Sequence, residues 1–150
     1  MANERQDLII LLQSADAIER DVERLLRQIH ACPVPDPPLA TRISGWLEET
    51  IRHRDRISHC IGRIDGDENN PQVQMQNLPV SAETGIEESQ ESLDANLAKL
   101  RREANREVAF YTSVVAAAEV GGFFETKLVC EAILSQKTSM ANWLSYRVRK

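Results

Sequence analysis

The 150-residue sequence has little of what builds β-sheets or disulfide frameworks. Aromatic residues make up only 5% of it, and β-branched residues rarely alternate with polar ones, which gives strands little support. Three cysteines, Cys32, Cys60 and Cys130, form no CxxC or other metal-type spacing and cannot all pair within one chain. We therefore expect an all-α protein with free, mostly buried thiols, which is typical of a reducing compartment.

The sequence also has no signal-peptide core and no basic face. The apolar run near the N-terminus, Leu8–Leu12, is too short for a secretion signal or a membrane span. The formal net charge of −5 argues against nucleic acid as the main partner. We expect a cytoplasmic protein with neither a membrane nor a nucleic-acid partner. No serine nucleophile elbow, phosphate loop or Rossmann glycine pattern is present, so whether the chain is an enzyme stays open.

One strongly apolar stretch, Glu107–Gly122, dominates what the sequence does contain. Ten of the thirteen residues from Val108 to Val120 are Val, Ala, Phe or Tyr, which predicts a central helix. Its most buried stripe repeats at intervals of four and three residues: Leu100, Ala104, Glu107, Tyr111, Val114 and Ala118. A carboxylate on such a stripe must find a partner or give up its charge, so Glu107 is a candidate functional residue.

Four long amphipathic segments predict a four-helix bundle that occupies residues 1–150 as a single domain. We expect helices over residues 4–30, 39–64, 84–120 and 123–147, with prolines between Cys32 and Pro38 ending the first. Thr84 and Glu87 form a capping-box pattern, but residues 84–120 could be one helix or two with a break near Ser92–Asp94. Residues 65–80 have no helical period and predict a long crossover loop between helices 2 and 3. That connection is typical of the ferritin-like arrangement.

Each predicted helix places a polar residue on or beside its inner stripe: Glu19, Glu49 with His53, Glu107, and Gln136. Ferritin-like di-metal sites use one glutamate from each of two helices and a Glu-x-x-His motif from each of the other two helices. Carboxylates and imidazole suit Fe, Mn or Zn, which predicts Glu19, Glu49, His53 and Glu107 as metal ligands. The alternative is a metal-free polar network, with Glu107 hydrogen-bonded to Tyr111, Gln136 or His53.

Two of these stretches resemble a known family. LEETIRHRDRI at Leu47–Ile57 and EVAFYTSVVAAAEVGG at Glu107–Gly122 are similar to helices 2 and 3 of the YciE/YciF-type ferritin-like bacterial stress proteins. Asp16-Ala17 followed by Glu19 resembles the first helix of that family. The resemblance implies a cytoplasmic four-helix bundle, often a homodimer, that is associated with stress responses. It places metal ligands at Glu19, Glu49, His53 and Glu107.

The sequence departs from the family pattern at two places. It has Ser135-Gln136 where relatives carry consecutive acids in the fourth helix, and Ala104 where they carry an acid one turn before Glu107. Two functions are therefore expected as alternatives. One is a ferritin-like stress protein with a degenerate Fe, Mn or Zn site in the bundle centre. The other is a metal-free helical bundle that acts through homodimerisation or a protein partner.

Overall fold

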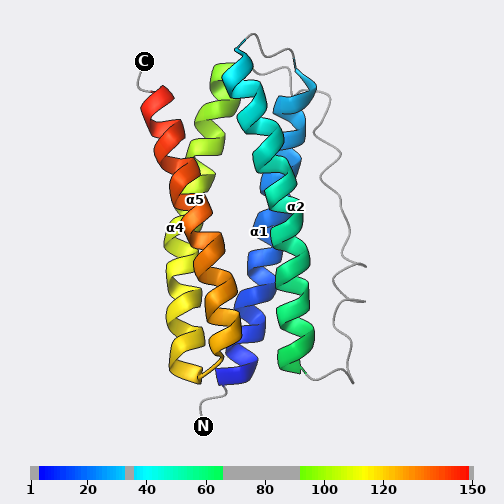
Figure 1. The fold of residues 1–150 in the computed structure, drawn as a ribbon, viewed down its shortest axis with the longest axis vertical. Helices are drawn as coiled ribbons and strands as arrows, with labels where there is room; N and C mark the ends of the chain where they lie inside the picture. The colour runs from blue at the N-terminus through cyan, green and yellow to red at the C-terminus, as the bar shows by residue number, and fades with distance from the viewer. Residues whose placement is uncertain (1–3, 33–35, 66–91, 149–150) are drawn as a thin grey trace.

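The computed structural model describes residues 4–32, 36–65 and 92–148, and these form a four-helix bundle. The helices are α1 (Glu4–Ala31), α2 (Pro37–Asp65), α4 (Leu93–Gly121) and α5 (Phe124–Val148). Figure 1 shows α2 and α4 running in the same direction, with α1 and α5 antiparallel to them. The end of α2 and the start of α4 therefore lie at opposite ends of the bundle, and the predicted ferritin-like four-helix fold is confirmed. The predicted crossover loop lies, from residue 66 on, outside the described residues.

Local signals in the sequence explain where the described helices begin and end. Pro37 stands in the first turn of α2, where a missing N–H costs no helical hydrogen bond. The Ser92 hydroxyl accepts a hydrogen bond from the Ala95 N–H at 3.1 Å, so α4 begins at Leu93 and continues unbroken to Gly121. Gly122 ends α4 in the left-handed conformation, with φ of 81°. The predicted cap at Thr84 lies outside the described residues.

The apolar core is divided into two clusters along the bundle axis. One cluster combines residues of 8–15, 57–64, 111–118 and 130–133, and the other combines residues of 22–29, 39–46, 97–104 and 140–144. The predicted stripe of α4 is confirmed, because every one of its six residues is buried. Between the two clusters, each helix contributes a polar side chain to the interior. No helix in the described part of the chain is long and apolar enough to cross a membrane.

The predicted inner face of α5 is wrong by one position. Gln136 was expected to face the core, but it is only partly buried, whereas Lys137 is fully buried. Apolar residues are distributed around all faces of α5, so several stripes fit its sequence almost equally well. The stripe that packs inward is Thr126, Cys130, Ile133, Lys137, Met140 and Leu144.

Candidate functional site at the bundle centre

A layer of polar side chains crosses the centre of the bundle, halfway along every helix. We call it the central layer; it consists of Glu19 on α1, His53 on α2, Glu107 and Tyr111 on α4, and Lys137 on α5. His53 keeps 7% of its surface exposed, and the other four members are 0% exposed. Burial of so many polar groups is unfavourable unless they satisfy one another, so their contacts determine what the layer can do.

Lys137 connects the two carboxylates of the central layer. Its Nζ lies 2.9 Å from Oε1 of Glu19, to which it donates a hydrogen bond, and 3.2 Å from Oε1 of Glu107. The Tyr111 hydroxyl donates to the other oxygen of Glu19, Oε2, at 2.6 Å. Both oxygens of Glu19 are therefore occupied by donors, whereas Glu107 has its ion pair with Lys137 and accepts no well-aligned hydrogen bond from the described residues.

The protonation states in the central layer follow from burial and from these pairs. Burial raises the pKa of Glu107 well above its usual value, and the charge of Glu19 adds to this effect while Lys137 opposes it. Burial alone lowers the pKa of Lys137, but the charges of Glu107 and Glu19 outweigh it and raise that pKa. Burial also raises the pKa of Tyr111.

The His53 side chain in the central layer is a neutral imidazole. Burial, and next the charge of Lys137, lower its pKa to about 4. Its Nδ1 is buried and has no hydrogen-bond partner among the described residues. An unpaired buried ring nitrogen is costly, so His53 is a candidate for binding a group or for changing partners.

A second set of charged side chains links α1 to α2. Asp16 on α1 is 3% exposed and pairs with Arg54 on α2. Arg54 donates to Oδ1 of Asp16 at 3.2 Å and to Oε1 of Glu23 at 3.1 Å. This contact joins α2 to α1 and holds Asp16 in the interior.

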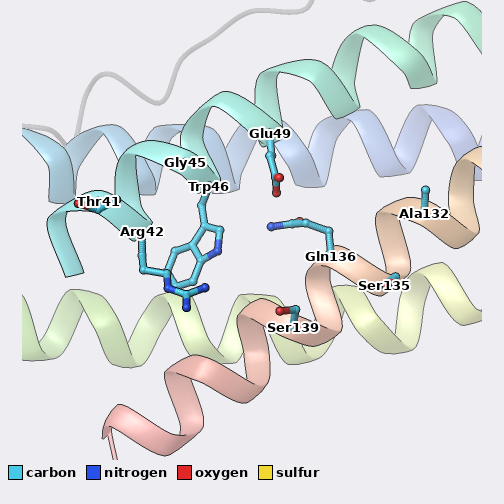
Figure 2. Close-up of a pocket in the computed structure, with 9 residues that line it drawn as sticks. All are labelled: Thr41, Arg42, Gly45, Trp46, Glu49, Ala132, Ser135, Gln136 and Ser139. Atoms are coloured by element: carbon cyan, nitrogen blue, oxygen red, sulfur yellow. The ribbon is translucent and has the colours of Figure 1, made fainter. Parts of the chain in front are cut away.

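The predicted ligand set is brought together only in part. Glu19, His53 and Glu107 belong to the central layer, but Glu49 lines a groove of about 660 Å³ between α2 and α5. Figure 2 shows Glu49 and Gln136 pointing toward one another across that groove. Within the described ranges, no three His, Cys, Asp or Glu side chains converge closely enough to hold a metal ion.

The side chains present do not fit the di-metal centre that the ferritin-like arrangement implies. An ammonium group with three N–H donors cannot be a metal ligand, and that of Lys137 lies between the two central glutamates. Both oxygens of Glu19 already accept hydrogen bonds. The ligand set Glu19, Glu49, His53 and Glu107, with Fe, Mn or Zn, stays a prediction that this geometry does not favour.

Sequence reasoning missed Lys137, although a signal for it was present. Cys130, Ile133, Lys137, Met140 and Leu144 repeat at intervals of three and four, which is the period of a buried helical stripe. A lysine is almost never fully buried unless it is paired, so the period alone does not predict a buried Lys137. The buried acids predicted at Glu19 and Glu107 need a cationic partner, and together with the period they point to Lys137.

These features define the class of the molecule, a ferritin-like four-helix bundle with a charged layer buried at its centre. A family model described as "Domain of unknown function (DUF892)" matches residues 4–149, and the chain belongs to this family. A crystal structure of a protein from Xanthomonas campestris pv. campestris is similar, with 24% identity, a TM-score of 0.79, and coverage of 99% of this chain and 92% of that one.

The Escherichia coli stress protein YciF is a second similar structure. It has 20% identity and a TM-score of 0.72, and the match covers 99% of this chain and 96% of that one. The predicted resemblance to the YciE/YciF-type family is confirmed by the family match together with this structure.

Proposed function

We propose that this protein is a cytoplasmic, stress-related member of its family that acts through contact between protein surfaces, with a second copy of itself as the partner. The stress role is suggested by the family and by the similarity to the Escherichia coli stress protein YciF. The choice of a surface over a reaction centre comes from burial. Glu19, Glu107 and Lys137 are 0% exposed, so a substrate cannot reach them unless the bundle opens.

The observation that carries the proposal is an apolar surface at the turn between α4 and α5. Val120 on α4 and Phe124 and Leu128 on α5 are 74%, 60% and 64% exposed, and we call them the turn patch. Phe124 and Leu128 are one helical turn apart, so they share a face of α5. Large exposed apolar side chains that gather at one place are typical of interaction surfaces.

Charges of both signs lie around the turn patch. Lys127 is 3.8 Å from Glu119 and 3.8 Å from Glu131, and Arg63 pairs with Glu125. A two-fold symmetric interface places the same surface on both partners, so a positive group on one copy must meet a negative group on the other. An apolar centre with mixed charges at its rim satisfies this requirement, and this supports a second copy as the occupant.

The proposal is tested by sedimentation velocity of the wild type and two matched variants. Leu128→Glu puts a charge into the turn patch, and we expect it to shift the protein from dimer to monomer at micromolar concentration. Ile51→Glu makes the same kind of change at a 43% exposed residue of α2, outside the patch, and should leave the dimer intact. A wild-type monomer, or an equal loss of dimer in both variants, would contradict the proposal.

The stress role and the location need their own tests. Buried free thiols at Cys60 and Cys130 fit a reducing compartment, and burial raises the pKa of Cys130 to about 12, which keeps it unreactive. Quantitative immunoblotting of cell fractions should find the protein in the cytoplasm, with increased abundance after osmotic or oxidative stress. Unchanged abundance under every stress tested would argue against the stress role but would leave the dimer interface unaffected.

A further inference from the structure

Lys137 supplies positive charge in the interior at the level where ferritin-like bundles hold metal ions. Its ammonium contacts the carboxylates of Glu19 and Glu107, and all three side chains are fully buried. We propose that Lys137 is the resident cation of this bundle. Its ammonium holds the two carboxylates together without a metal ion, and removal of its side chain creates a divalent-cation site between them.

The contact distances support this exchange of one cation for another. Nζ of Lys137 lies 2.9 Å from Oε1 of Glu19 and 3.2 Å from Oε1 of Glu107. A cation at the position of Nζ is therefore close to both carboxylates. Metal–oxygen bonds are shorter, at about 2.0–2.2 Å, and the flexible glutamate side chains can close that difference. Truncation of the lysine to alanine leaves room for an ion with bound water molecules.

The donors that remain identify the class of ion. Two carboxylates and water suit divalent cations such as Mn²⁺, and an imidazole extends the range to Co²⁺ and Zn²⁺. His53 becomes a third ligand only if its imidazole moves, because in the present structure it does not converge with the two glutamates closely enough to share an ion. Its Nδ1 is buried without a hydrogen-bond partner among the described residues.

The experiment compares untagged wild type with Lys137→Ala and Lys127→Ala. Lys127 is the matched control, because it is on the same helix and is 3.8 Å from both Glu119 and Glu131, but its side chain is 25% exposed. Each protein is incubated with Co²⁺ or Mn²⁺ and desalted, then assayed for metal content, visible absorption of Co²⁺ and thermal unfolding. For Lys137→Ala we expect about one ion per chain and a melting temperature that rises with metal concentration. Wild type and Lys127→Ala should retain no stoichiometric metal and show no such rise.

A second variant identifies the ligands of the new site. Lys137→Ala combined with Glu107→Gln removes one of the two carboxylates and should lose most of the metal that the single variant gained. If Lys137→Ala does not fold without metal, refolding from denaturant with Co²⁺ replaces the titration. Recovery of the folded state only with Co²⁺ then supports the proposal, and failure to recover overturns it.

Two further results would overturn the proposal. One is a wild-type protein that binds metal stoichiometrically and loses it in Glu107→Gln, because Lys137 would then coexist with the ion. The other is a folded Lys137→Ala that binds no more metal than Lys127→Ala. Neither result depends on the oligomeric state, so the outcome is separate from that of the Leu128→Glu experiment.

Discussion

The hydrogen bond from Tyr111 to Glu19 gives the sharpest test of the central layer. The Tyr111 hydroxyl lies 2.6 Å from Oε2 of Glu19, and both side chains are fully buried. Tyr111→Phe keeps the ring and its packing but leaves a carboxylate oxygen without a donor. A hydrogen bond to a charged group contributes about 1.5–3 kcal/mol, so we expect the free energy of unfolding to fall by about 2 kcal/mol. For a chain of this length, the melting temperature should then fall by about 4–8 °C.

The assay is urea unfolding followed by circular dichroism, with Tyr146→Phe as the control. Tyr146 is 79% exposed, so removal of its hydroxyl should change the free energy of unfolding by less than about 0.5 kcal/mol. A double-mutant cycle with Glu19→Gln should show that the tyrosine substitution costs less when the acceptor carries no charge. If Tyr111→Phe is as stable as Tyr146→Phe, the layer is not held by this hydrogen bond and the reasoning fails.

Two further predictions concern pH and the backbone. The pKa of His53 is lowered to about 4 from an ordinary value of 6.5. Between pH 4 and pH 6.5, His53 is therefore protonated in the unfolded chain but not in the folded chain. Its contribution to stability is complete above pH 6.5 and is lost as the pH falls toward 4. The loss amounts to about 3 kcal/mol, and urea titrations at several pH values should show that His53→Gln lacks it. Gly122→Ala forces a β-carbon onto a residue with φ of 81° and should cost about 1–2 kcal/mol. Gly45→Ala in α2, where an added β-carbon meets nothing within 4 Å, should instead stabilise by about 0.5–1 kcal/mol. Equal effects of the two glycine substitutions, or a pH dependence unchanged in His53→Gln, would contradict these predictions.

Sequence periodicity was enough to predict the fold because the helices are long and strongly patterned. The intervals that begin at Leu100 identified every buried residue of the α4 stripe through Ala118, and the prolines after Cys32 identified the end of α1. The charged contacts are harder to predict from the sequence, because they join side chains that are far apart in the chain. Glu19 and Lys137 are separated by 118 positions, and only the assembled bundle shows that they meet.

The burial of Asp16 and the position of Glu49 likewise depend on how the helices pack. Asp16 has no partner that the sequence alone identifies, yet it is buried because Arg54 of the neighbouring helix pairs with it. Glu49 was expected at the centre with His53, yet it lines the groove between α2 and α5. Glu49 and His53 are four positions apart on the helix, which sets them on roughly one face. The rotation of α2 then decides which of the two reaches the interior, and a periodic pattern does not fix that rotation to within one residue.

Charge balance explains why lysine and a metal ion are alternatives at the centre of this bundle. With His53 neutral, the single positive charge of Lys137 lies between the carboxyl groups of Glu19 and Glu107. A divalent ion added beside Lys137 would bring an excess of positive charge into a region shielded from water, at a cost of several kcal/mol even after relaxation. Even with both carboxyl groups ionised, three positive charges would face two negative ones. Position 137 therefore decides between the two states, because an ion can be accommodated only when the ammonium of Lys137 is removed.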